Sequence, residues 1–117
     1  MTTPKPGQPV RGSTTGRPIM ALLDLLGRRW TLRVIWELRD ETLTFRALRA
    51  RCDDVSPTML NRRLAELREA EIVAADAGYA LTESGRALLA AILPLQRWAD
   101  DWAASRDRPA GDTGRAP

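Results

Sequence analysis

The chain has 117 residues, of which 44% are hydrophobic, and it carries a formal net charge of +3 at pH 7; this is enough for one small domain with a compact core, and the charge favours an acidic partner. It has no histidine and a single cysteine, Cys52, which excludes histidine-based acid–base catalysis, thiol–imidazole pairs, multi-cysteine zinc sites and an intramolecular disulfide. Arginine supplies nearly all of the positive charge, which suits phosphate and guanine and is equally what a GC-rich genome produces.

Both ends of the chain have the composition of disordered segments. Residues 1–17 are rich in Pro, Gly and Thr and contain three basic residues but no acid, so we expect a basic arm that either touches phosphates or, as the simpler interpretation, is an unstructured leader. Residues 105–117 form a second predicted tail, which leaves a domain over 18–104. Neither an apolar leader segment nor a run of ~18 apolar residues is present, so the sequence predicts a cytoplasmic protein without membrane contact.

The first half of the predicted domain has helical periodicity. Apolar residues repeat at helical spacing over 19–26 and again over 30–38, which predicts two helices. Leu43 is a candidate short strand, and Thr44 can cap a third helix that follows it directly. This third helix turns its apolar residues, with Cys52 at its end, toward the interior.

A fourth helix begins after Ser56, which can cap it. Its buried stripe has i, i+4, i+7 spacing and consists of Leu60, Leu64 and Leu67. The N-terminal half of the opposite face is polar and basic, and that is the end with which a recognition helix reads bases. The segment alone slightly favours a helix whose arginines are only solvated, but its surroundings reverse this preference.

We therefore predict a DNA-reading helix over 56–70. The candidate DNA-binding residues are Ser56, Pro57, Thr58, Met59, Asn61, Arg62, Arg63 and Arg46. Ser56, Arg63 and Arg46 are the candidates for phosphate contacts, and the side chains on the exposed face of the helix are those for base edges.

The second half of the domain begins with a change of period. After Glu71 the apolar period falls from 3.6 to 2, which predicts two short strands around a turn at 76–78. Thr82 can cap a last helix over 83–104, which Pro94 should kink or break. Two helices joined by a tight turn and followed by a hairpin predict a winged helix-turn-helix, mainly α with a small β-hairpin.

Four segments carry further motifs, namely "LLGRRWTLRVIWEL", "TFRALRARC", "SPTMLNRRLAEL" and "YALTESG". Together they resemble the HxlR-type winged helix-turn-helix regulators of bacteria, in the MarR-like superfamily. Each motif is weak alone, but four in this order over 18–102 are specific. The resemblance implies a homodimeric transcription factor in which terminal helices form the dimer interface and a wing lies beside each recognition helix. The implied interface residues are Leu22, Leu23, Leu26, Leu95, Trp98 and Trp102.

A last helix with two tryptophans has more apolar surface than a small monomer needs, which agrees with this interface. The alternative is that both tryptophans cover the core of their own protomer.

Three departures from the family pattern limit what carries over. Many members have a cysteine before the proline of the first helix, and some use it to sense electrophiles or oxidants, whereas this chain has Arg17 there. Cys52 lies elsewhere, where a small buried thiol is the favoured interpretation. The predicted wing is short, contains no arginine and has Asp76 near its tip, so a minor-groove contact is not expected. Ala47 stands where the family usually has glutamate.

We interpret the chain as a homodimeric, sequence-specific transcriptional regulator that reads a pseudo-palindromic site in double-stranded DNA through the helix 56–70. One alternative is a winged-helix protein-interaction module without specific DNA binding, which the short acidic wing favours. Another is a regulator with a small-molecule effector in a pocket at the dimer interface, lined by Trp30, Trp36 and Trp98. Tryptophans at helical spacing more often belong to the core.

An enzyme is not expected. The two adjacent aspartate pairs, at 53–54 and 100–101, fit a turn and the polar face of a helix. No glycine-rich phosphate loop is present. We therefore expect neither a cofactor nor a metal.

Overall fold

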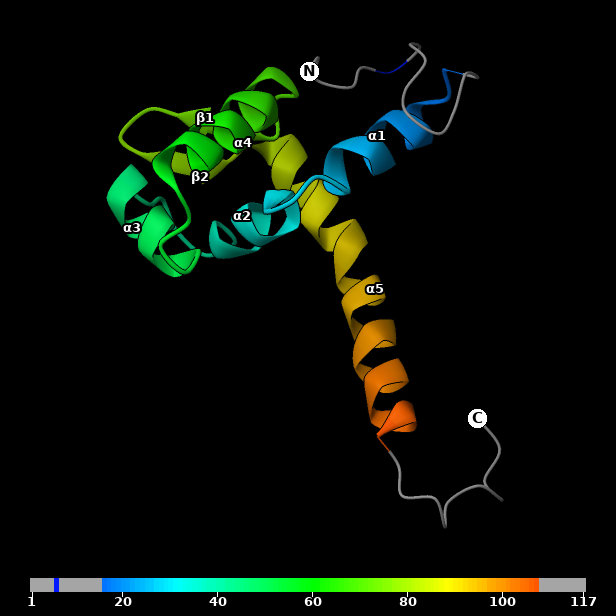
Figure 1. The fold of residues 1–117 in the computed structure, drawn as a ribbon. Helices are drawn as coiled ribbons and strands as arrows, with labels where there is room; N and C mark the ends of the chain where they lie inside the picture. The colour runs from blue at the N-terminus through cyan, green and yellow to red at the C-terminus, as the bar shows by residue number, and fades with distance from the viewer. Residues whose placement is uncertain (1–5, 7–15, 108–117) are drawn as a thin grey trace, which may run out of the picture.

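The computed structural model describes Pro6 and residues 16–107. Within these residues, five helices and two strands follow in the order α1 (Pro18–Leu26), α2 (Thr31–Glu37), α3 (Phe45–Arg51), α4 (Pro57–Glu69), β1 (Val73–Ala75), β2 (Tyr79–Leu81) and α5 (Glu83–Arg106). The helices α2, α3 and α4 form a body with the two strands, and the second half of α5 projects from it (Figure 1). The predicted class, mainly α with a small hairpin, is confirmed.

The predicted ends of the chain fall mostly outside the described residues. This applies to all of the basic arm over 1–17 except Pro6, Gly16 and Arg17, and to the tail from residue 108 onward. The last helix continues to Arg106, two residues beyond the predicted end at Ala104. The domain boundaries themselves stay predictions.

Three helices begin at the caps that the sequence predicts. In each case the side-chain oxygen accepts a hydrogen bond from the backbone N–H three residues further on, at 3.0 Å for Thr44, 3.1 Å for Ser56 and 2.9 Å for Thr82. Each bond satisfies a backbone donor that has no partner inside its helix. The starts of α3, α4 and α5 are therefore set by local sequence.

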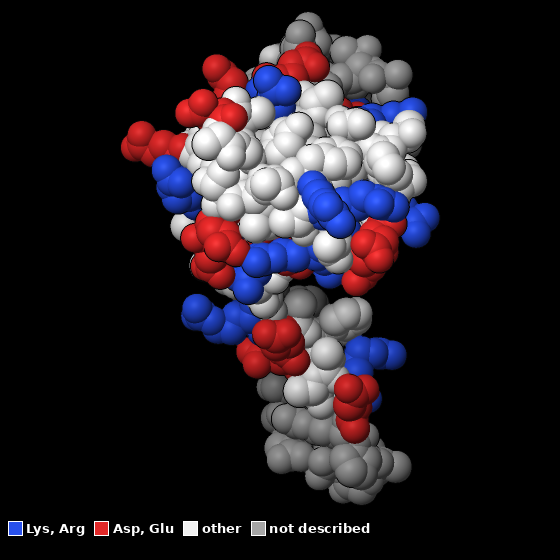
Figure 2. Space-filling view, turned by 90° about the vertical axis from the view of Figure 1, so that its left-hand side faces the viewer, with Lys and Arg blue, Asp and Glu red and all other residues white. Residues whose placement is uncertain are grey.

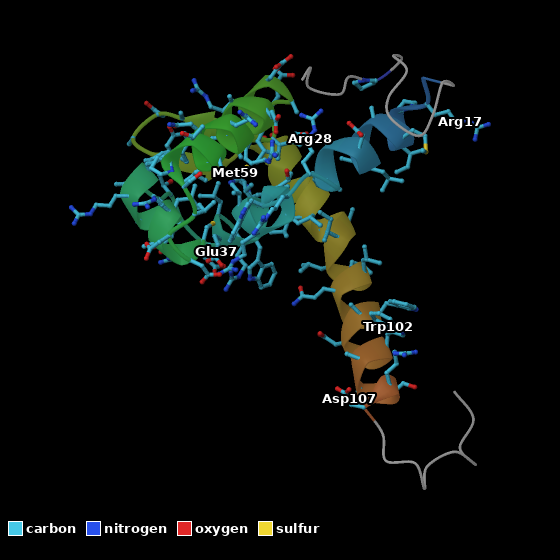
Figure 3. The ribbon with its side chains drawn as sticks, in the orientation of Figure 1. Arg17, Arg28, Glu37, Met59, Trp102 and Asp107 are labelled. Carbon is cyan, nitrogen blue, oxygen red and sulfur yellow. The ribbon has the colours of Figure 1, made fainter. Side chains whose placement is uncertain are left out.

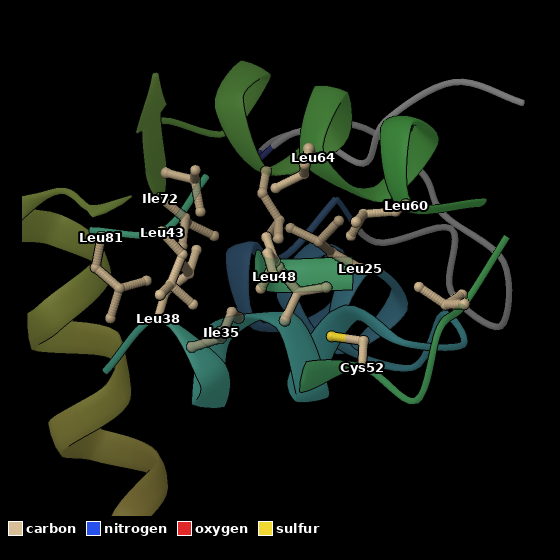
Figure 4. Close-up of a cluster of buried hydrophobic side chains, with 14 residues drawn as sticks. Leu25, Ile35, Leu38, Leu43, Leu48, Cys52, Leu60, Leu64, Ile72 and Leu81 are labelled. Atoms are coloured by element: carbon tan, nitrogen blue, oxygen red, sulfur yellow. The ribbon is translucent and has the colours of Figure 1, made fainter. Parts of the chain in front are cut away.

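The core lies between α2, α3, α4 and the hairpin (Figure 4). It is a single cluster of buried side chains, namely Leu25, Val34, Ile35, Leu38, Leu43, Leu48, Cys52, Val55, Leu60, Leu64, Leu67, Ile72, Val73 and Leu81. The predicted leucine stripe of α4 belongs to it, with Leu60 and Leu67 fully buried. Burial of this stripe orients α4, because the face opposite to it must point outward.

The hairpin pairs β1 with β2 in antiparallel register, with Val73 opposite Leu81. The predicted strand at Leu43 is a single bridge to Tyr79, with mutual backbone hydrogen bonds of 2.9 and 2.7 Å. Gly78 at the turn has φ of +145°, and a Cβ there would lie 2.9 Å from the carbonyl oxygen of Leu43. Only glycine fits both the backbone angle and this close approach.

The last helix joins the body through its first turns only. Gly85 is buried against the carbonyl of Ile72, where a Cβ would overlap. From Leu93 to Asp107 every residue is exposed. The helix runs through Pro94 without interruption, so the predicted local break is wrong. Ala90, whose carbonyl loses its helical donor at Pro94, is exposed, so water can take that donor's place.

Candidate nucleic-acid interface

A tight turn holds α4 against α3. Asp53 and Asp54 both adopt left-handed backbone conformations, with φ of 56° and 57°, which aspartate tolerates better than most residues. Arg49 of α3 fastens the turn, because its Nε donates to the carbonyl of Val55 at 2.7 Å. Val55 itself is buried in the core. This turn presents the N-terminus of α4 at the surface.

The exposed face of α4 is polar in its first two turns. Thr58, Asn61 and Arg62 are exposed, as are Ser56 and Pro57 at the start of the helix. Met59 is half-buried and packs against the core. Of the predicted base-edge candidates, Met59 therefore offers the least side chain to a ligand.

The arginines near this face differ in whether they have an acidic partner. Arg33 and Arg51 form ion pairs, at 3.1 Å with Asp53 and at 2.6 Å with Glu41. In contrast, Arg46 and Arg62 are exposed and form no ion pair with any residue that the structure describes. They remain the cations best placed to meet a phosphate or a guanine.

The surface beside α3 and the hairpin carries both signs of charge. Basic and acidic side chains are interspersed around a broad uncharged area (Figure 2). An acidic ligand at this face would therefore meet a few separate cations rather than a uniformly positive field.

Arg63, a predicted candidate for a phosphate contact, is largely buried. The residue is only 9% exposed, and its Nη1 donates to Glu66 at 2.8 Å while its Nε donates to the carbonyl of Arg29 at 2.7 Å. Helical spacing carries a signal for this, because position i+3 from Leu60 lies on the buried face together with Leu64 at i+4. The carbonyl of Arg29, 34 residues away along the chain, carries no such signal.

The wing is short and acidic, as the sequence predicts. Its strands have three residues each, and Asp76 in the turn is exposed. The nearest arginine that follows, Arg86, donates to the carbonyl of Leu81 at 3.1 Å.

The predicted dimer residues lie on α1 and α5. Leu22 and Leu26 are half-buried. The large side chains at the other positions are 52–64% exposed, namely Leu23, Leu95, Trp98 and Trp102. Trp98 and Trp102 stack on each other with ring centroids 5.7 Å apart, on the part of α5 that leaves the body (Figure 3). Neither tryptophan therefore covers the core of its own protomer.

The predicted tryptophan pocket is not assembled within one chain. Trp36 lines a cavity of about 280 Å³ between α2 and α5, together with Leu32, Ile35, Leu89, Ile92 and Gln96. Trp30 packs partly against the core instead, and Trp98 stacks on Trp102. Trp30 precedes the first residue of α2, Trp36 lies near the end of α2, and Trp98 lies on α5.

Cys52 is fully buried at the end of α3. Burial raises the pKa of its thiol to about 11, so the reactive thiolate is scarce at neutral pH. Arg17, which precedes Pro18, is exposed.

Two other kinds of site have no counterpart in the described part of the chain. Over Pro6 and residues 16–107, no helix combines the length and the apolar character needed to span a membrane. The cysteine and carboxylate side chains of these residues form no group of three that could hold a metal ion.

The fold and the exposed N-terminal half of α4 define a winged helix-turn-helix protein. Residues 25–107 match the model of the HxlR-like helix-turn-helix family, and the chain belongs to that family. The family and its curated members support assignment to the DNA-binding helix-turn-helix transcriptional regulators.

Two curated relatives come from Bacillus subtilis (strain 168). The chain is 33% identical to the HTH-type transcriptional regulator YodB over 99 residues, which cover 78% of this chain and 88% of YodB. It is 27% identical over 88 residues to YvaP, an uncharacterised HTH-type transcriptional regulator, with 68% and 82% covered. A crystal structure of quinone-bound YodB superposes with a TM-score of 0.67 at 37% identity and covers 71% of this chain and 96% of that one.

Proposed function

We propose that the protein is a homodimeric regulator that reads a pseudo-palindromic operator, with one α4 helix from each protomer in successive major grooves about 34–36 Å apart. The observation that carries the proposal is the polarity of α4. Its leucine face is buried, while Thr58, Asn61 and Arg62 are exposed in its N-terminal half. A recognition helix contacts base edges with this end.

The exposed residues divide into two roles. Arg62 suits a bidentate contact to guanine, and Asn61 suits one to adenine. Arg46 and the hydroxyl of Ser56 suit phosphates, as do the free N–H groups at the start of α4. Capping of α4 does not prevent a phosphate contact by Ser56, because its oxygen accepts the capping hydrogen bond and its O–H remains able to donate.

The second half of α5 supports the dimer. From Leu93 onward nothing among the described residues covers this helix, although it carries Leu95, Trp98 and Trp102. An isolated helix of fewer than about 12–15 residues is only marginally stable in water. A second copy of α5 and of the exposed side of α1 offers the apolar partner that this segment lacks within its own protomer.

We do not propose a cysteine thiol as the group that responds to an effector. A solved structure of YodB is described as quinone-bound. In this chain, Cys52 is the only cysteine, and it is buried with a raised pKa. Both features disfavour the addition of an effector to this thiol at neutral pH.

The test is fluorescence anisotropy with DNA from upstream of the protein's own gene and with scrambled DNA, over a salt series. We expect a clear preference for the upstream DNA and affinity that falls with salt. The Arg62→Ala variant should bind about 1–3 kcal/mol more weakly if Arg62 reads a guanine.

The matched control is Arg68→Ala, which removes the same charge from an exposed position at the other end of α4. Unchanged affinity in Arg62→Ala removes this residue from the readout. Equal, weak binding of the wild type to both DNAs would move the function toward a protein partner.

A further inference from the structure

A buried group of charged side chains fastens α4 to the junction of α1 and α2. Glu66 of α4 accepts one hydrogen bond on each carboxylate oxygen, from Arg28 Nη1 at 2.6 Å and from Arg63 Nη1 at 2.8 Å. Arg63 Nε also donates to the carbonyl of Arg29 at 2.7 Å. Arg28 follows the end of α1 (Figure 3) and lies 3.5 Å from the carboxylate of Asp24 on that helix.

The group is shielded from water. The side chains of Arg28, Arg63 and Glu66 are only 4%, 10% and 8% exposed. Taking charges out of water is costly, and apolar residues of similar size often stabilise such positions equally well or better. Stability alone therefore does not explain a charged group beside a leucine stripe. What its hydrogen bonds add is direction, since they tolerate only a narrow range of geometries.

The direction matters because two arginines are adjacent on α4. Arg62 and Arg63 point about 100° apart around the helix axis, since the helix has 3.6 residues per turn. The leucine stripe sets which face of α4 is buried, but it leaves a smaller roll of the helix about its axis open, because apolar packing is not directional and cores tolerate repacking. With Arg63 bonded to Glu66 and to the Arg29 carbonyl, Arg62 is the arginine that stays outside.

We propose that Arg28, Arg63 and Glu66 are positioning residues, which set the roll of α4 about its axis and thereby decide which side chains reach the base edges. This inference rests on the proposed reading role of α4. Arg63 then acts without touching DNA. Through the ion pair between Arg28 and Asp24, the group also sets how α4 lies relative to α1, which carries part of the proposed dimer surface.

The test compares the wild type with a charge-neutral double variant, Arg63→Met with Glu66→Leu. This variant leaves the net charge unchanged and leaves Arg28 with Asp24 as a partner. The single variant Arg63→Met retains the pair between Glu66 and Arg28, so it remains informative if the double variant does not fold. The control is Arg68→Gln with Glu69→Gln, a charge-neutral pair at exposed positions of the same helix.

The DNA is a sequence that the wild type selects from a random pool, with scrambled DNA as the reference. We expect the double variant to lose about tenfold or more in discrimination, the effect of losing one base contact. Its melting temperature should be unchanged or higher, and its affinity for scrambled DNA should be unchanged. The salt slope of Arg63→Met should equal that of the wild type.

Three other results would overturn either the proposed function or the positioning role. If the wild type selects no consensus, the proposed function fails before the positioning role is reached. If the wild type selects one and both variants discriminate within twofold of it, the positioning role is overturned. If the salt slope of Arg63→Met falls by about 0.9 while discrimination persists, Arg63 contacts a phosphate and the positioning role is again overturned.

Discussion

The N-terminal half of α4 and the C-terminal half of α5 are both exposed helical surfaces, but they are supported in opposite ways. Behind the exposed face of α4, Leu60, Leu64 and Leu67 are buried in the core. Nothing within Pro6 and residues 16–107 gives the second half of α5 such support, and its own exposed residues include Trp98 and Trp102. A helix that is anchored in the core can keep polar side chains exposed, whereas large apolar side chains on an unanchored helix favour contact with a partner.

The largest expected effect is on the free energy of unfolding, and it compares how much core packing stabilises α4 and the second half of α5. Leu60→Ala removes a fully buried side chain and should lower the free energy of unfolding by about 2–5 kcal/mol. Leu95→Ala changes a side chain that is 64% exposed within its protomer. Urea unfolding of both variants at two protein concentrations distinguishes a contact within one protomer from a contact between copies.

The loss in Leu60→Ala should be independent of concentration, because the contact lies within one chain. Any loss in Leu95→Ala should shrink on dilution, because it reports the contact between copies. A large loss at Leu95 that persists on dilution contradicts the idea that this half of α5 is unsupported within its protomer.

The next largest effect is expected on self-association, from a substitution on the apolar face of α5. Trp98→Ala should weaken self-association by about 2–4 kcal/mol, since buried tryptophans dominate the binding energy of interfaces. Sedimentation equilibrium measures the dissociation constant directly. Arg97→Ala, at the neighbouring exposed position, is the control and should change it little. A monomeric wild type at micromolar concentration refutes the dimer.

The stability of the protein should depend on pH through the buried thiol of Cys52. The folded pKa of Cys52 is about 11 against an ordinary value of 9.0, so the folded state binds the proton more tightly. The free energy of unfolding should therefore be unaffected by this group below pH 9 and should fall by about 2–3 kcal/mol as the pH rises from 9 toward 11.

Denaturant unfolding of the wild type and of Cys52→Ala from pH 7 to 11 isolates this effect, because other groups titrate in both proteins. The difference between the two should narrow above pH 9. A constant difference across this window means that the thiol is not held in its neutral form by burial.

The smallest effect concerns the start of the reading helix. Ser56→Ala removes the cap of α4 and should cost about 1 kcal/mol of stability, with a modest loss of operator affinity. Thr44→Ala removes the matching cap of α3 and serves as the comparison. Thermal unfolding and anisotropy on the same samples check both parts. Equal losses of affinity in both variants would assign the effect of Ser56 to stability rather than to phosphate contact.

Local features of this chain were predictable because their causes lie within a few residues. The caps at Thr44, Ser56 and Thr82 each depend on a donor three residues away. The leucine stripe of α4 follows from its spacing, and the hairpin follows from the change of period after Glu71. The order of elements then indicated the winged helix-turn-helix fold, which the structure and the family assignment confirm.

The candidate site was predictable only in part. The exposure of Thr58, Asn61 and Arg62 agrees with the face expected from the stripe. Their contacts with DNA remain predictions. The tryptophan pocket stays a prediction, because it was expected between two protomers; within one protomer, Trp36 lines a cavity that neither Trp30 nor Trp98 lines. Helical spacing says which residues share a face, but it does not say which faces of different helices meet.

The sequence by itself determined where the helices begin, which face of α4 is apolar and which family the chain resembles, since these depend on short-range spacing and on motifs. Only the tertiary structure decided which groups outside α4 form hydrogen bonds with Arg63 and Glu66. The partners of Arg63 and Glu66 are Arg29 and Arg28, 34 and 38 residues away along the chain. Hydrogen bonds between groups so far apart along the chain form only once folding has brought the groups together.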